Sequence, residues 1–147
     1  MKTRCHSLTA RAALALGALV SVAALAQTGG LPAVQRSGSV EYLSGGIGID
    51  ESTAIKAASP QWPLTLEFAV STQPRADYAS DVQVTVRDAH NAVALQTTSS
   101  GPFLLVKLPP GQYSVDALFA GKTEHQSVTV VQGRPARSMF TWPAAAG

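Results

Sequence analysis

Alternation of apolar and polar residues constrains the fold of this chain more than any other feature of its sequence. Between residues 64 and 70 an apolar residue recurs at every second position, and the same pattern runs through 82–86, 113–119 and 128–130. Successive side chains of a strand point to opposite faces, so this pattern places one face in a core and the other in water. The sequence therefore predicts half-buried antiparallel strands.

Residues that favour turns separate these segments. Asp88–Asn91 is expected to form a turn, since Asn tolerates the left-handed conformation, and Pro109-Pro110-Gly111 fits a type II turn with Gly111 at positive φ. Gly121 and Gly133 indicate two further turns. Short strands with turns at near-regular spacing are typical of a sandwich. We expect seven strands and a possible eighth, at 39–43, 64–71, 81–88, 92–97, 103–108, 112–120, 126–131 and 137–142.

One short helix is predicted after the first strand. Residues 51–58 favour a helix, with Asp50 at the N-cap, Glu51 in the first turn and Pro60 at the end. The predicted fold class is all-β: a seven- to eight-stranded antiparallel β-sandwich with this one helix.

The N-terminus has the three parts of an export signal. Lys2, Arg4 and Arg11 precede an apolar stretch at 12–26, which ends in Ala-Leu-Ala before Gln27. A run of about 15 apolar residues is short for a spanning helix, which needs about 20. We expect residues 1–26 to be a cleaved signal peptide and the mature protein to be periplasmic, with secretion as the alternative.

Removal of this segment changes the chemistry of the chain. The only cysteine, Cys5, lies inside it, so the mature chain has no disulfide and no lipid-bearing Cys. Three of the 11 basic residues also lie there, which leaves eight against nine acidic residues. We therefore expect no nucleic-acid partner and no membrane anchor after cleavage. Residues 27–37 are predicted to be a flexible leader, and residues 38–143 a single domain.

No catalytic constellation is visible in the sequence. The mature chain keeps two histidines, His90 and His125, and neither has a partner at metal-ligand spacing. It contains no Gly-x-Ser-x-Gly elbow. The acidic pairs 50–51 and 77/81 lack the fixed spacing that a glycosidase or a Ca²⁺ site requires. We expect no metal and no cofactor.

Candidate interaction residues lie in two kinds of place. A glycine loop leads into the predicted helix, where backbone N–H groups could bind an anion, although neighbouring carboxylates oppose this. Aromatic residues outside the alternating segments could contact a glycan or a partner protein, or could pack over the end of the sandwich. The predicted interaction surface comprises Gly45, Gly46, Gly48, Asp50, Glu51, Trp62 and Tyr78.

Residues 108–121 read LPPGQYSVDALFAG, a strand–turn–strand segment that resembles carboxypeptidase-regulatory-like domains. The preceding SDVQVTVRDAHNAVAL and GPFLLVK fit the same pattern, and the resemblance covers roughly 40–142. The GGIGIDE segment and the closing FTW are similar to a subgroup of small exported Gram-negative proteins. The resemblance implies a transthyretin-like (prealbumin-like) sandwich, a fold that serves many functions.

These observations favour a non-catalytic module that binds or supports another component of the cell envelope, either a protein or a glycan. The alternative is a small hydrolase or ligand-binding enzyme that uses loop carboxylates. A third possibility is that a partner's strand pairs with an open sheet edge.

Overall fold

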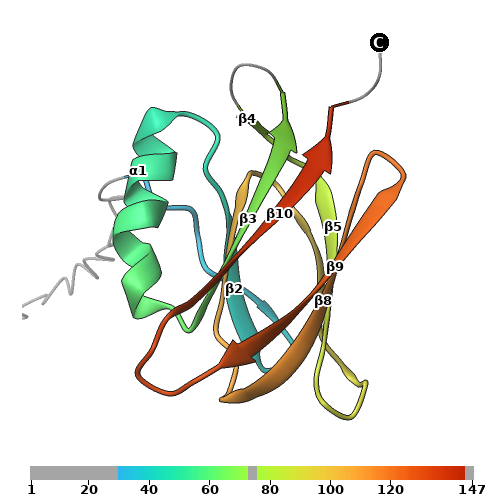
Figure 1. Cartoon of the computed structure of the whole chain (residues 1–147). Coiled ribbons are helices and arrows are strands. Elements are labelled where there is room, and N and C mark those ends of the chain that lie inside the picture. Colours follow the sequence, from blue (N-terminus) through green and yellow to red (C-terminus); the bar gives the residue numbers. More distant parts are fainter. Residues whose placement is uncertain (1–29, 73–75, 145–147) are drawn as a thin grey trace, which may run out of the picture.

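Two β-sheets and one short helix make up the chain in a computed structural model, which describes residues 30–72 and 76–144 (Figure 1). The expected signal peptide, residues 1–26, lies outside the described residues. The elements in chain order are β1 Gln35–Ser37, β2 Val40–Gly45, α1 Ile49–Ala58, the 3₁₀ turn η1 Ser59–Gln61, β3 Leu64–Ser71, β4 Ala76–Tyr78, β5 Val82–Arg87, β6 Val93–Ser99, β7 Phe103–Val106, β8 Gly111–Phe119, β9 Lys122–Val130 and β10 Ala136–Pro143.

The strands form a sandwich whose order differs in detail from the prediction. Sheet A has the order β1-β2-β7-β3-β10, with β4 also paired to β3, and sheet B has the order β6-β5-β8-β9. All pairs are antiparallel except β3 with β10, which run side by side in the same direction in Figure 1. The all-β class and the two layers are confirmed. The expectation of an entirely antiparallel sandwich of seven or eight strands is wrong, because β10 returns parallel to β3 and two three-residue strands were not anticipated.

The main core fills the space between the sheets with the apolar residues of the alternating segments. Leu64, Leu66 and Phe68 of β3 face Val84 and Val115 of sheet B, and each of these side chains is at most 1% exposed. Burial of this kind, at roughly 25 cal/mol per Å² of apolar surface, is the main stabilising contribution to such a domain. The period-two pattern therefore predicted the inner faces correctly.

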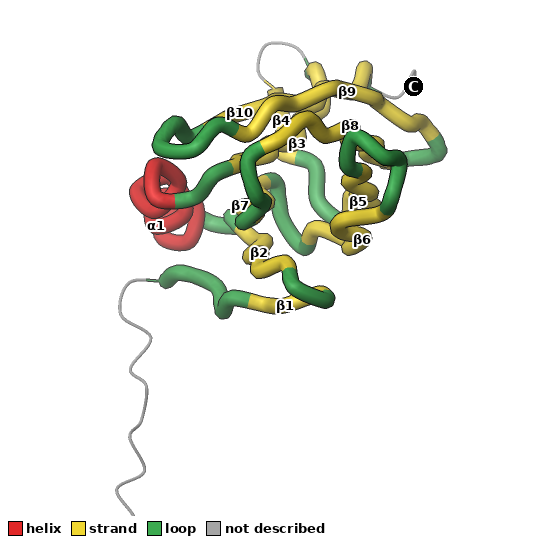
Figure 2. The backbone as a smooth tube through the Cα atoms, turned by 90° about the horizontal axis from the view of Figure 1, so that it is seen from below, coloured by secondary structure: helices red, strands yellow, loops and turns green. Residues whose placement is uncertain are grey.

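The outer face of sheet A departs from the pattern, because α1 covers it. Figure 2 shows α1 lying outside the layer of strands, beside β2, β3 and β7. Under the helix a second apolar cluster forms from Leu43, Ile55, Trp62, Phe103 and Leu105. Thr65 and Glu67 of β3, which the alternation placed in water, are consequently buried. Glu67 is 5% exposed and is paired with the guanidinium of Arg137.

Two predicted boundaries move for local reasons. Residues 27–37 were expected to be a flexible leader, but Gln35–Ser37 pair with β2 as strand β1. Strand β9 begins at Lys122 instead of 126, because Ala120 and Gly121 both have positive φ, 51° and 77°. Positive φ at both central residues is the geometry of a two-residue type I′ hairpin turn. The hairpin therefore keeps β8 and β9 paired up to their ends.

The turn between β5 and β6 is held by one aspartate. The Asp88 carboxylate accepts hydrogen bonds from the backbone N–H groups of His90 (2.9 Å) and Ala92 (3.0 Å). Asn91 occupies the left-handed region at φ 64°, as the sequence predicted.

The expected type II turn at 109–111 is not formed. Gly111 has φ 159°, an extended conformation, and is the first residue of β8. The turn is fixed instead by Tyr113, whose hydroxyl donates to the carbonyl of Pro109 at 2.6 Å.

Side chains join the two sheets along the seam between β9 and β10. The Gln126 side-chain amide donates to the backbone carbonyl of Met139 at 2.5 Å, and the Ser138 hydroxyl donates to the Gln126 amide oxygen. The Trp142 indole N–H donates to the carbonyl of Lys122 at 3.0 Å. These contacts lie where the last strand of each sheet would otherwise be an open edge.

No helix in the described part of the chain is long and apolar enough to cross a membrane.

Candidate functional site

The glycine loop is a tightly packed structural element. A Cβ on Gly45 would collide with the Glu51 carboxylate and lie 2.7 Å from the Pro32 ring. A Cβ on Gly46, whose φ is 101°, would collide with the Phe103 ring. Both glycines are buried. Their lack of a side chain is therefore required by close packing at this end of β2.

A carboxylate of the chain itself is hydrogen-bonded to the glycine loop. Glu51 sits in the first turn of α1, and its carboxylate accepts the backbone N–H of Gly46 at 2.7 Å. A carboxylate near a helix N-terminus is favoured by the helix dipole. The expected N-cap, Asp50, is instead an exposed residue of the first turn, and Gly48 occupies the cap position without a side-chain hydrogen bond. The Gly46 N–H, one of the donors that could have bound an external anion, is thus already paired within the chain.

The two candidate aromatic residues lie at opposite ends of β7. Tyr78, on β4, is 53% exposed and packs against Phe103 with ring centroids 5.7 Å apart. Trp62 is only 7% exposed and belongs to the cluster beneath α1, with the Lys107 ammonium 5.0 Å from its ring centroid. The predicted surface is therefore divided: the glycine loop, the start of α1 and Tyr78 lie at one end, and Trp62 lies at the other.

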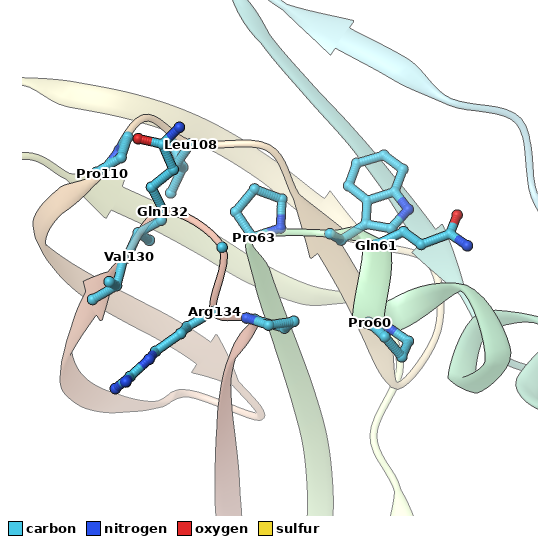
Figure 3. Close-up of a pocket in the computed structure, with 12 residues that line it drawn as sticks. Pro60, Gln61, Pro63, Leu108, Pro110, Val130, Gln132 and Arg134 are labelled. Carbon is cyan, nitrogen blue, oxygen red and sulfur yellow. The ribbon is translucent and has the colours of Figure 1, made fainter.

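A groove of about 420 Å³ opens beside Trp62. Three segments that are distant in sequence form it: η1 with the start of β3, the turn between β7 and β8, and the turn between β9 and β10. In Figure 3, Leu108, Val130 and Arg134 lie on one side of Pro63, and Pro60 lies on the other. The lining is mainly apolar, with Pro60, Trp62, Pro63, Leu108, Pro110, Val130, Val131 and Pro135, and its polar members are Gln61, Gln132 and Arg134.

Hydrogen bonds within two turns define the walls of the groove. In the β9–β10 turn the Arg134 N–H donates to the Val131 carbonyl at 3.1 Å, and Gly133 has φ 78°, as the third residue of a type II turn requires. On the opposite wall the Tyr113 hydroxyl anchors Pro109. Burial, and to a lesser degree the Asp88 carboxylate, raises the pKa of the Tyr113 phenol above its ordinary value. Tyr113 therefore stays a hydrogen-bond donor at neutral pH.

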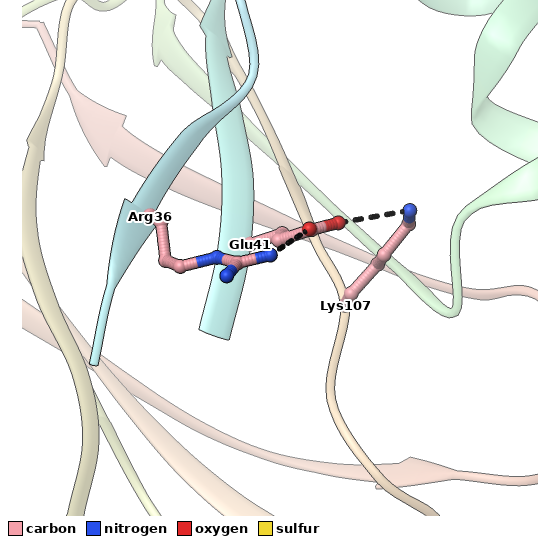
Figure 4. Close-up of polar contacts among 3 residues, drawn as sticks. All are labelled: Arg36, Glu41 and Lys107. Carbon is pink, nitrogen blue, oxygen red and sulfur yellow. Dashed lines mark hydrogen bonds and ion pairs between the residues drawn. The ribbon is translucent and has the colours of Figure 1, made fainter. Parts of the chain in front are cut away.

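An ion-pair network holds Lys107, whose ammonium lies over the Trp62 ring, and Figure 4 shows Glu41 between Arg36 and Lys107. Glu41 binds Arg36 at 2.5 Å and Lys107 at 3.1 Å. The hydrogen bond from Arg36, followed by that from Lys107, lowers the pKa of the Glu41 carboxyl. Exposed pairs contribute little to stability, but this one keeps the ammonium over the indole face.

A second polar cluster lies on the outer face of sheet B. Asp116 of β8 accepts a hydrogen bond from Arg87 of β5 at 3.1 Å and contacts Nδ1 of His125 of β9 at 2.5 Å. The sequence shows no metal-ligand partner for His125 and does not predict this contact. Predicting this contact requires the register of the two strands, because Asp116 and His125 become opposite partners only when β8 and β9 pair.

The remaining candidates do not converge. His90, Asp77 and Asp81 are exposed on separate turns or strands. Among residues 30–72 and 76–144, no three His, Cys, Asp or Glu side chains come together as metal ligands.

Comparison with known proteins gives no family for the chain. No family model and no curated protein matches it. A solved structure described as "Crystal Structure of S.CueP" is similar at 14% sequence identity with a TM-score of 0.34, over 54% of this chain and 60% of that chain. This chain thus spans less than two thirds of that protein, and the likeness is too slight to support an argument about fold type or function.

Proposed function

We propose that this protein is a non-catalytic binding module of the cell envelope, exported to the periplasm by residues 1–26, which holds an apolar segment of a partner protein. The observation that carries this proposal is the groove beside Trp62, whose apolar walls come from three separate segments of the chain. Clefts with apolar linings and a few placed polar groups are the usual ligand sites of proteins.

The carboxypeptidase-regulatory-like, transthyretin-like assignment of the sandwich is part of the same proposal. The turn at 107–110, which carries the chain from sheet A to sheet B, supports it.

A peptide suits the groove better than a glycan does. Sugars stack on the open face of an aromatic ring, but the Trp62 ring is nearly buried and has the Lys107 ammonium over one face. Proline rings and aliphatic side chains form most of the walls, and these contact apolar side chains without needing hydrogen bonds. Arg134 is the only charged side chain in the lining. An apolar peptide with one carboxylate therefore complements the groove.

The hydrolase alternative has little support among the described residues. Glu51, one of its candidate carboxylates, already accepts the Gly46 N–H. Asp50, Asp77 and Asp81 are exposed, and none of them lines the groove beside Trp62. A glycosidase needs its two carboxylates on either side of one bound sugar.

Photo-crosslinking tests the groove directly. A photoreactive residue is placed at Gln132, and as a control at Asp50, in the full precursor expressed in a Gram-negative host. The crosslinked segment is identified by mass spectrometry and synthesised as a peptide. We expect this peptide to bind the purified protein, and Val131→Asp and Arg134→Glu to weaken binding by about tenfold or more, whereas Thr53→Asp on α1 leaves it unchanged. Equal crosslinking from both positions, or binding that Val131→Asp does not alter, would contradict the proposal.

Export is tested separately. The full chain is expected in the osmotic-shock fraction with its N-terminus at Gln27, and a chain that lacks residues 2–26 is expected to stay in the cytoplasm. Retention of an intact N-terminus in the membrane fraction would overturn this part of the proposal.

A further inference from the structure

The outer face of sheet B is dense in hydroxyl and amide side chains and nearly balanced in charge. Register aligns these residues in rows across the four strands. One row is Thr98, Gln83, Leu118 and Thr123, and the next is Gln96, Thr85, Asp116 and His125. Exposed strand faces usually carry several unpaired charges that keep a protein soluble. Here the charges of the central strands are restricted to one cluster.

Within that cluster, opposite charges are paired with one another. The Asp116 carboxylate binds the Arg87 guanidinium and contacts the His125 ring, so the opposite charges of Arg87 and Asp116 offset one another at the centre of the face. The contacts also hold the planar guanidinium and imidazole in place. The His125 side chain is 60% exposed, and no described residue is a hydrogen-bond partner of its Nε2. Fixed planar polar groups of this kind can bind hydroxyls without first being ordered.

The outer face of sheet B also has two depressions, which follow one another along the strand direction. The larger depression, of about 470 Å³, lies over Gln83, Thr85, Gln96 and Thr98 and reaches Asp116. A second one, of about 330 Å³, lies over Gln112, Ser114, Ser127 and Thr129, and Asp88 of the β5–β6 turn lines its end. Ser114 is two residues from Asp116 on the same face of β8, so the two depressions succeed one another along the sheet. Their shape fits an extended ligand.

We propose that this face of sheet B binds a neutral glycan chain. A charged polymer would find no unbalanced charge in the larger depression, since Arg87 and Asp116 are paired. An uncharged polyhydroxylated chain finds donors and acceptors side by side, and Leu118 offers an apolar contact to a sugar ring. An apolar peptide would leave the Gln and Thr groups without partners. This site lies on the outer face of sheet B, and its lining shares no residue with the groove beside Trp62.

The test uses soluble oligosaccharides as probes. Amide chemical shifts of the ¹⁵N-labelled mature chain are followed while cellohexaose, the hexamer of N-acetylglucosamine, or the anionic hexamer of galacturonic acid is added to millimolar concentration. We expect at least one neutral hexamer to shift the amides of β5, β8 and β9 and the anionic hexamer to bind more weakly. No shift with either neutral probe, stronger binding of the anionic one, or shifts centred on the Trp62 groove would overturn the proposal.

Variants locate the binding groups. Gln83→Ala with Thr98→Ala removes neutral hydrogen bonds, and Asp116→Asn releases Arg87 and His125 while keeping the size of the side chain. Each is expected to weaken binding of the neutral hexamer by about tenfold, the effect of losing one or two hydrogen bonds. Gln132→Ala, which removes the same amide from the groove instead, is expected to leave glycan binding unchanged. Unchanged affinity in the Gln83/Thr98 variant, with its spectrum showing an intact fold, would contradict the assignment.

Discussion

Tyr113 shows how a single hydrogen bond shapes the turn at which the chain passes from one sheet to the other. Its hydroxyl reaches back four residues to the Pro109 carbonyl, and its ring is buried at 8% exposure. Tyr113→Phe leaves that carbonyl without its donor, so we expect the free energy of unfolding to fall by about 1–2 kcal/mol. Urea denaturation should show a lower midpoint with an unchanged slope. Tyr78→Phe removes an exposed hydroxyl and is expected to change stability little. Equal effects of the two changes would contradict this role.

The same residue makes a prediction about alkaline pH. The pKa of Tyr113 is raised in the folded state, chiefly by burial, so folding favours the neutral phenol. Its contribution to stability is complete below the unfolded pKa of about 10 and is lost as the pH rises through the folded value. We expect the wild-type chain to lose stability between neutral pH and pH values above about 10. Tyr113→Phe should lose less over that range in the same denaturation series.

The pKa of Glu41 shifts in the opposite direction to that of Tyr113 and leads to a prediction about acidic pH. Hydrogen bonds from Arg36 and Lys107 lower the pKa of its carboxyl, so folding favours the charged form. The resulting stabilisation is present above the unfolded pKa of about 4.3 and is lost as the pH falls through the folded value. Side-chain carbon NMR should give a titration midpoint for Glu41 below the ordinary glutamate value of about 4.3, and Lys107→Met should move the Glu41 midpoint upward. An unmoved midpoint would show that Lys107 does not interact with this carboxyl in solution.

At the scale of elements, the loop between β2 and α1 depends on two different properties of glycine. Gly46 and Gly48 both have positive φ, 101° and 90°, but a Cβ on Gly46 would collide with Phe103, whereas one on Gly48 would meet nothing within 4 Å. We expect Gly48→Ala to cost about 1–2 kcal/mol from backbone strain alone. Gly46→Ala should cost about 1–3 kcal/mol more, because the ring must move. Thermal denaturation of both variants measures the difference, and equal melting temperatures would contradict the packing argument.

The sequence predicts best those strands that have one face in the core and the other in water. The strands expected at 64–71 and 81–88 alternate because one face meets the core; the first is observed over the expected residues and the second at 82–87. The buried outer face of β3 could not be predicted, since α1 covers it only in the folded molecule. Strands β1 and β4 have three residues each, too few to show a period.

The candidate site was harder to predict than the fold for the same physical reason. Trp62 was recognised as a contact residue or a packing residue, and the structure assigns it mainly to packing. The groove beside it combines segments around residues 61, 109 and 133, and no local pattern in the sequence indicates that these meet. The pairing of Asp116 with His125 likewise depends on strand register, which alternation alone leaves open.

At the scale of the whole molecule, one glutamine helps to join the two sheets. Gln126 takes the place of a missing backbone partner: its amide N–H binds the Met139 carbonyl of β10, and its amide oxygen accepts the Ser138 hydroxyl. Gln126→Ala removes both hydrogen bonds, so we expect a loss of about 1–2 kcal/mol in stability. We also expect faster amide hydrogen exchange along β10, because this edge of sheet A would open more often. The matched control is Gln112→Ala on β8, where the amide is exposed. If both variants exchange alike along β10, the seam does not depend on Gln126, and the indole of Trp142, bound to the Lys122 carbonyl, must hold it alone.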